Sequence, residues 1–132
     1  AKLPGTYKAW LSSSSGSPAT RFTHNPGPYV LTNGKVIANY WLDLIDGNLL
    51  APIDIMENGR PRTGDEWVWT GTLSTGAAAP SLTCSDWTSS ASTERGIIGL
   101  SSNKDSFWTG DEVVPVTNTC DAPAHLYCFQ QR

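Results

Sequence analysis

The chain has 132 residues, of which 16% are charged, and its formal net charge is −3. This length is enough for one domain with a buried core, and we take residues 1–132 as that domain. The acidic balance and the scattered arginines argue against nucleic acid, heparin-like polyanions and anionic membrane surfaces as partners. No stretch approaches the ~18 consecutive apolar residues of a membrane-spanning helix.

The N-terminal part of the chain predicts an edge strand, a loop and a turn. Residues 6–11 alternate between polar and apolar side chains, as an edge strand does. Residues 12–17 are serines and one glycine, which predicts a polar surface loop. Residues 25–28 read Asn-Pro-Gly-Pro, a turn that neither a helix nor a central strand could contain.

The next segments predict a hairpin, a short helix and another strand. Residues 29–31 and 35–37 are apolar runs on either side of Asn33-Gly34, the strongest short hairpin signal. Residues 41–45 have helical spacing for one or two turns. Residues 49–55 are typical of a strand, in which a proline at position 52 indicates an edge.

Three further strands are expected to form a sheet core. Residues 66–72 contain aromatic and β-branched side chains that suit a half-buried strand. Residues 81–84 predict a second short strand, and residues 125–129 alternate well enough for a third, in a final hairpin that opens at Cys120. We expect everything between Cys84 and Cys120 to be loop, apart from a brief strand candidate at residues 107–109. No helix longer than about three turns is expected.

The cysteine count indicates the redox compartment. Three cysteines are an odd number, so in a secreted protein one thiol stays free or pairs outside the given sequence. A cytosolic protein would keep all three reduced. The Ser-, Thr- and Gly-rich composition favours the first alternative, and we expect a secreted or cell-surface protein. The chain begins at Ala1 without methionine, as expected of a processed or excised fragment.

Four short segments follow one another as they do in a known protein family. They are residues 5–12 (Gly-Thr-Tyr-Lys-Ala-Trp-Leu-Ser), residues 68–72 (Val-Trp-Thr-Gly-Thr), Cys84 with Trp87, and Cys120 with Cys128. The first resembles the segment that begins the main body of endostatin and of bacterial endostatin-like domains. The others resemble the tryptophan-glycine strand, the cysteine-x-x-tryptophan and the closing cysteine pair of the wider C-type lectin-like fold.

The resemblance implies an α+β, C-type lectin-like (endostatin-like) fold of mostly short antiparallel strands and long loops. It implies a disulfide between Cys84 and Cys120, and a partner for Cys128 in an N-terminal helix. Because the chain begins where that helix would end, we expect the first helix to be missing here. Cys128 is then unpaired or partnered outside this chain, for example in a homo-oligomer or with a second chain.

The same resemblance raises calcium-dependent sugar binding. C-type lectins that bind sugar through calcium carry a Glu/Gln-Pro-Asn/Asp motif, which does not occur between Cys84 and residue 108. The loop residues that remain as candidates for ligand contact are Trp108, Asn103, Asp105, Asp111 and Glu112. Calcium prefers about six to eight oxygen ligands, so this supply is thin, and a solvated acidic loop is the alternative. Trp108 is alternatively a core residue that braces the loop.

Zinc binding and catalysis find less support in the sequence. His24 and His125 do not have the spacing of zinc ligands, and we predict no metal centre. No serine lies in a Gly-x-Ser-x-Gly elbow, and two histidines offer few general bases, so we predict that the protein is not an enzyme.

A recognition surface is the remaining class of function. Residues 85–119 interleave Ser, Thr, Gly and Asn with aromatic side chains, as binding surfaces do. We therefore predict a non-catalytic extracellular binding or adhesion domain, of a bacterial surface kind, that recognises a matrix-like protein or a glycan through its long loop. A structural subunit of an extracellular assembly, completed by a neighbouring chain, and a calcium-dependent lectin are the alternatives.

Overall fold

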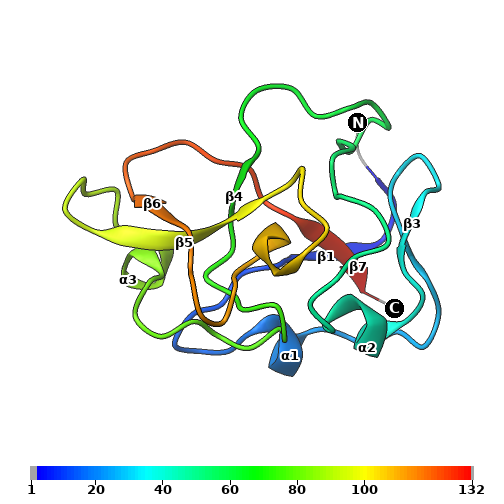
Figure 1. Cartoon of the computed structure of the whole chain (residues 1–132), viewed down its shortest axis with the longest axis horizontal. Coiled ribbons are helices and arrows are strands. Elements are labelled where there is room, and N and C mark those ends of the chain that lie inside the picture. Colours follow the sequence, from blue (N-terminus) through cyan, green and yellow to red (C-terminus); the bar gives the residue numbers. More distant parts are fainter. Residues whose placement is uncertain (1–2, 132) are drawn as a thin grey trace.

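Within residues 3–131, which the computed structural model describes, the strands pair into three small antiparallel sheets (Figure 1). The strands are β1 (Thr6–Ala9), β2 (Tyr29–Val30), β3 (Val36–Ala38), β4 (Trp67–Trp69), β5 (Arg95–Leu100), β6 (Thr117–Thr119) and β7 (Cys128–Gln131). Single helical turns lie between them: α1 (Pro18–Arg21), α2 (Trp41–Leu44), α3 (Cys84–Trp87) and the 3-10 turn η1 (Ser106–Trp108). The predicted class, α+β with mostly short antiparallel strands, is confirmed.

The first sheet joins segments from opposite ends of the chain. Strand β1 pairs with β7, so that Thr6 lies opposite Gln131 and Ala9 opposite Cys128. Figure 1 shows the two strands side by side. The edge strand expected at residues 6–11 is therefore confirmed over its first four residues. The hairpin expected to open at Cys120 is wrong, because β7 pairs with β1.

The second sheet is the predicted hairpin. Strands β2 and β3 pair through a turn in which Gly34 has a φ of 89°, a conformation that glycine adopts without steric cost. The amide of Leu31 donates to the carbonyl of Lys35 at 2.8 Å and closes the loop. The helix predicted at residues 41–45 is confirmed as the single turn α2.

The third sheet has β5 at its centre, between β4 and β6. The strand expected at residues 66–72 is confirmed as β4. The expectation that everything between Cys84 and Cys120 is loop is wrong, because β5 and β6 both lie there. Four consecutive residues of β5, Gly96 to Gly99, are buried, so this strand shows no polar–apolar alternation from which it could be recognised.

Three other predicted strands are wrong. Residues 49–55 contribute only the isolated bridge between Ile55 and Pro61 within the described chain. Residues 107–109 lie in and just after η1. Residues 81–84 lead into α3 instead of forming a strand. The turn α1 was not predicted, although Ser17 followed by Pro18 is a sequence signal for a helix start.

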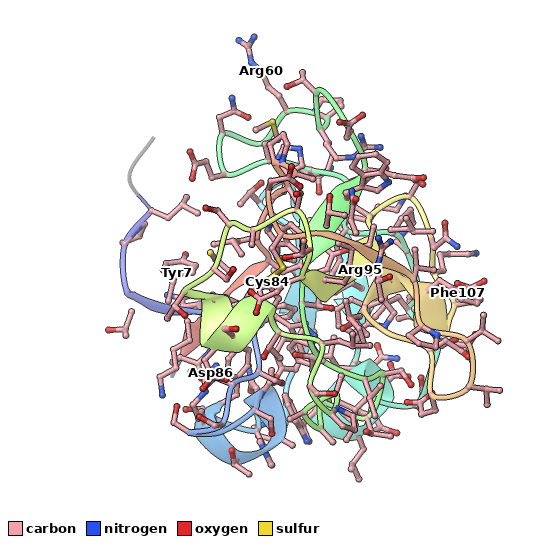
Figure 2. All side chains as sticks on the ribbon, turned by 90° about the vertical axis from the view of Figure 1, so that its left-hand side faces the viewer. Tyr7, Arg60, Cys84, Asp86, Arg95 and Phe107 are labelled. Carbon is pink, nitrogen blue, oxygen red and sulfur yellow. A yellow bond between two sulfur atoms is a disulfide. The ribbon has the colours of Figure 1, made fainter. Side chains whose placement is uncertain are left out.

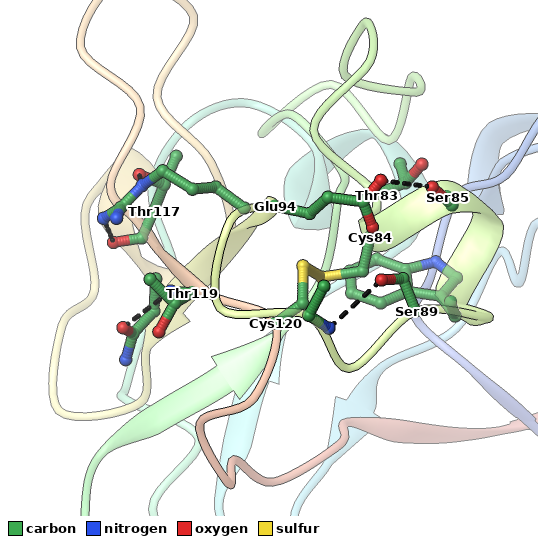
Figure 3. The surroundings of a disulfide bond; sticks show 12 residues. Thr83, Cys84, Ser85, Ser89, Glu94, Thr117, Thr119 and Cys120 are labelled. Carbon is green, nitrogen blue, oxygen red and sulfur yellow. Dashed lines mark hydrogen bonds between the residues drawn. A yellow bond between two sulfur atoms is a disulfide. The ribbon is translucent and has the colours of Figure 1, made fainter.

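The turn α3 is left-handed. Its residues Cys84, Ser85, Asp86 and Trp87 have φ values of 50°, 52°, 57° and 64°. Non-glycine residues adopt this region at a cost of roughly 1–2 kcal/mol each, so the surroundings must hold the turn. The disulfide between Cys84 and Cys120 ties it to the end of β6 (Figure 3). The carboxylate of Asp86 accepts hydrogen bonds from the amide and hydroxyl of Ser14.

The core is an aromatic cluster around Trp10, which is fully buried. Its ring centroid lies 4.9 Å from that of Trp108, 5.4 Å from that of Phe129 and 5.7 Å from that of Phe22. The indole nitrogen of Trp10 donates to the hydroxyl of Thr109 at 2.8 Å. Trp10 follows β1, and Trp108 with Thr109 begins the long loop before β6. The core therefore fixes where that loop leaves the body of the protein.

Candidate functional site

The loop that the sequence singles out starts inside the core. Trp108 is fully buried, and its ring also lies 5.6 Å from that of Tyr127. The carbonyl of Trp108 accepts a 2.8 Å hydrogen bond from the hydroxyl of Tyr127. The prediction that Trp108 contacts a ligand at the surface is therefore wrong. The structure confirms the alternative prediction, that Trp108 is a core residue that braces the loop.

The polar candidates before Trp108 shape the 3-10 turn. One oxygen of Asp105 accepts from the amide of Phe107 at 3.2 Å and caps η1. The same oxygen accepts from the side-chain amide of Asn103 at 3.2 Å. Both side chains lie at the surface, but the arrangement between them is that of a helix cap.

The two acidic candidates after Trp108 hold the following loop. The carboxylate of Asp111 accepts from the hydroxyl of Ser106 at 2.5 Å and from the amides of Val113 and Val114 at 3.0 and 2.8 Å. These hydrogen bonds, that of Ser106 above all, hold the pKa of Asp111 below its ordinary value. Glu112 accepts from the hydroxyl of Ser74. Both carboxylates therefore have structural roles as loop braces.

The braced loop exposes apolar side chains at its tip. We call residues 111–115 the loop tip. Its side chains Val113 and Val114 are 85% and 60% exposed, and Pro115 follows them. Figure 2 shows Phe107, which lies just before this loop, on the side of the molecule opposite Tyr7. The two valines were not among the predicted contact residues, because polar and aromatic side chains were taken as the signal of a binding surface.

The described residues offer no group of three or more His, Cys, Asp or Glu side chains that could hold a metal ion. His24 instead stacks on Trp41, with ring centroids 4.1 Å apart and an angle of 4° between the planes. The backbone of His125 bridges to β4, since its amide donates to Trp67 and its carbonyl accepts from Trp69.

The predicted bond between Cys84 and Cys120 is confirmed, with the two Cα atoms 5.7 Å apart. Figure 3 shows it beside the hydrogen bond that the hydroxyl of Ser85 donates to Glu94 at 2.9 Å. Hydroxyl hydrogen bonds lower the pKa of this glutamate. An open hollow of about 640 Å³ lies next to the disulfide, lined by residues 81–86 and 93–95.

A second, more apolar pocket of about 350 Å³ lies away from the disulfide. Its wall comes from the β2–β3 hairpin, residues 53–57, β4 and residues 125–129. Cys128 lines this pocket and is unpaired among residues 3–131. Partial burial, and next the nearby carboxylate of Glu57, raise the pKa of its thiol. Sequence reasoning missed this pocket because its wall combines segments that are far apart in the chain.

Comparison of the sequence with models of known protein families and with curated proteins gives no match. In the part of the chain that the structure describes, no helix has both the length and the apolar character needed to cross a bilayer.

Proposed function

We propose that this chain is a non-catalytic extracellular binding domain, of the endostatin-like kind within the C-type lectin-like fold, and that the loop tip binds a protein ligand. The disulfide between Cys84 and Cys120 supports the first part of the proposal, the extracellular endostatin-like domain. It is the pairing that the family resemblance implies, and disulfides persist mainly in oxidising, extracytoplasmic compartments.

The observation that carries the proposal is the exposure of two adjacent valines on a loop with internal hydrogen bonds. The amides of Val113 and Val114 are both bound to Asp111, so the tip is already ordered before a partner arrives. A preordered loop loses less conformational entropy on binding. Burying the exposed parts of both valines, 85% and 60% of their surfaces, in an interface would contribute about 2–4 kcal/mol, at about 1.5–3 kcal/mol for a valine that is fully exposed beforehand.

The chemistry of the loop favours a protein over a glycan or a calcium-bound sugar. Sugar recognition uses free polar groups, and calcium needs several carboxylate oxygens. In this loop Asp105, Asp111 and Glu112 accept hydrogen bonds from the loop itself or from Ser74. The exposed side chains of residues 113–115 in the tip are apolar, as at the centre of protein interfaces.

The test compares the full chain with the double variant Val113→Ser, Val114→Ser on an array of matrix proteins and glycans. We expect the wild-type chain to bind a protein on the array and the double variant to bind it roughly 100-fold more weakly. Val36→Ser is the matched control, because Val36 is an exposed valine on β3 (36%). Equal binding by the double variant, or binding to glycans alone, would refute the proposal.

A subunit of an extracellular assembly is the second candidate function. Its support is Cys128, which is exposed on β7 and unpaired within the described residues. Partial burial raises the pKa of its thiol above the ordinary value, which lowers the fraction of reactive thiolate and slows exchange with other disulfides. Mass spectrometry of the natural protein under non-reducing conditions distinguishes the candidates. A covalent adduct at Cys128 with another chain supports assembly, and a free thiol argues against it.

A further inference from the structure

The apolar pocket has the size and shape of a ligand site. Its volume of about 350 Å³ falls in the range of roughly 300–1,000 Å³ that small-molecule sites occupy. It is more than twice a cavity of ~150 Å³ that accepts benzene. Buried apolar side chains form its wall, namely Leu31, Ile37, Val68, Tyr127 and Phe129. The pocket therefore offers a preformed apolar environment.

Part of the pocket's rim is apolar as well. Val30 and Leu126 line it and are 52% and 51% exposed. Ile53 and Ile55 lie on the same rim and are only partly buried. A molecule that fills the pocket would remove part of these four side chains from water, which is favourable in proportion to the apolar area covered.

Two polar groups in the wall have no hydrogen-bond partner in the described part of the protein. Ser101 is 1% exposed, and its hydroxyl oxygen is unpaired. The Nε of Arg62 is also buried and unpaired, although its Nη1 donates to the carbonyl of Gly64 at 2.8 Å. Both residues line the apolar pocket. Buried donors without acceptors are rare in folded proteins, and here both would be satisfied by an acceptor on a bound molecule.

The other charged groups of the pocket limit the charge of that molecule. Asp54 and Glu57 also line the pocket, and Glu57 acts on the Cys128 thiol. Their carboxylates disfavour ligands with several negative charges, such as phosphates. A single carboxylate or a neutral carbonyl beside the Arg62 guanidinium is compatible with all of these groups.

We propose that this pocket binds a small, largely aliphatic molecule with one carbonyl or carboxylate group, which accepts hydrogen bonds from Ser101 and Arg62. The site is separate from the loop tip. None of its lining residues belongs to residues 111–115. The two proposals therefore succeed or fail independently.

The binding test uses three probes that share an eight-carbon chain: octanoate, octanamide and octylamine. Calorimetry on the full chain measures affinity, and the rate at which iodoacetamide alkylates Cys128 reports whether the pocket is filled. We expect octanoate or octanamide to bind and to slow alkylation at least several-fold, and octylamine, which has no acceptor, to bind at least 10-fold more weakly. Absence of binding by both acceptor probes, or equal binding of octylamine, would overturn the proposal.

Variants of the polar wall test the assigned hydrogen bonds. Ser101→Ala should weaken binding of the better probe by about 2- to 10-fold, because one hydrogen bond is lost. The hydroxyl has no partner within the described protein, so this change should leave thermal stability intact. Ser102→Ala, at the exposed neighbouring residue, is the matched control. The double valine variant of the loop tip should bind the probe as the wild type does. Unchanged affinity in Ser101→Ala would refute the role given to this hydroxyl.

Discussion

The hydroxyl of Thr109 links the aromatic core to the neighbouring loop, and its removal should be costly. Thr109 is fully buried. Its oxygen accepts from the indole nitrogen of Trp10 at 2.8 Å and donates to the carbonyl of Thr72 at 2.7 Å. Thr109→Val has nearly the same shape but removes the acceptor of one group and the donor of the other.

The expected loss of stability comes from the two buried polar groups that lose their hydrogen-bond partner. Trp10 and Thr72 are also fully buried, so water does not reach the two groups that lose their partner. Each buried polar group without a partner costs about 1–3 kcal/mol, and the added methyl group returns roughly 1 kcal/mol. We expect Thr109→Val to lower the free energy of unfolding by about 1–5 kcal/mol. This is a large share of the roughly 5–15 kcal/mol that a domain of this kind has.

Equilibrium unfolding in urea, followed by tryptophan fluorescence and circular dichroism, measures the change. The matched control is Thr109→Ser, which retains the hydroxyl and loses one methyl group, at a cost of about 1 kcal/mol or slightly more. The serine variant should therefore be clearly more stable than the valine variant. If the valine variant is as stable as the serine variant, the hydrogen bonds of Thr109 do not stabilise the core and the reasoning is refuted.

Three further outcomes are expected. Replacing Cys84 and Cys120 together by alanine opens a 36-residue span and should lower the free energy of unfolding, measured in urea titrations, by roughly 4 kcal/mol. A loss below about 1 kcal/mol would contradict this. Asp111→Asn should destabilise the protein near neutral pH. Hydrogen bonds from Ser106 and from two amides lower the pKa of Asp111 in the folded protein below its ordinary 3.8. The ionised carboxylate therefore stabilises the folded state fully at pH values above 3.8. This stabilisation is lost as the pH falls through the lower pKa of the folded state. Thermal melts of both proteins across this pH range test it, and a difference that does not shrink in acid would contradict it. Gly99→Ala should cost about 3 kcal/mol or more, because an added Cβ would overlap the backbone carbonyl of the buried residue 108. Gly27→Ala is the control and should stay near the wild type, because its added Cβ meets only one side-chain atom, at 3.5 Å. Similar thermal melting of the two glycine variants would refute this.

Elements with a local cause were predicted well. The β2–β3 hairpin needs a residue that accepts positive φ at its turn, and Gly34 supplies it within four residues of both strands. Strand β4 and the single turn α2 also follow from short-range patterns. In each case the residues that cause the structure are neighbours in the sequence.

Elements that depend on a distant partner were predicted poorly. Residues 49–55 have strand-like composition but pair with no strand in the described chain, since only Ile55 forms a bridge. Strand β5 was hidden by its glycines, although Gly99 is required where the backbone of η1 packs against it. The strand expected at residues 81–84 gave way to a left-handed turn that the disulfide and Asp86 hold in place.

For the candidate site, the structure gives structural roles to the side chains that the sequence singled out. Asp105 and Asp111 are polar residues of the kind that contact ligands, yet their oxygens accept hydrogen bonds from amides two or three positions ahead. Trp108 has the aromatic side chain of a binding residue, but packing against Trp10 buries it. Val113 and Val114 became candidates only after their exposure was known.

The sequence by itself determined the composition, the turn positions, the class of few helices and mostly short strands, and the cysteines that could form a disulfide. Tertiary structure alone decided which strands are neighbours, which tryptophans are buried, and that residues from both ends of the chain line one apolar pocket. The physical reason is the range of the forces involved. Turn geometry acts over a few residues, whereas strand pairing and burial depend on surfaces that only folding brings together.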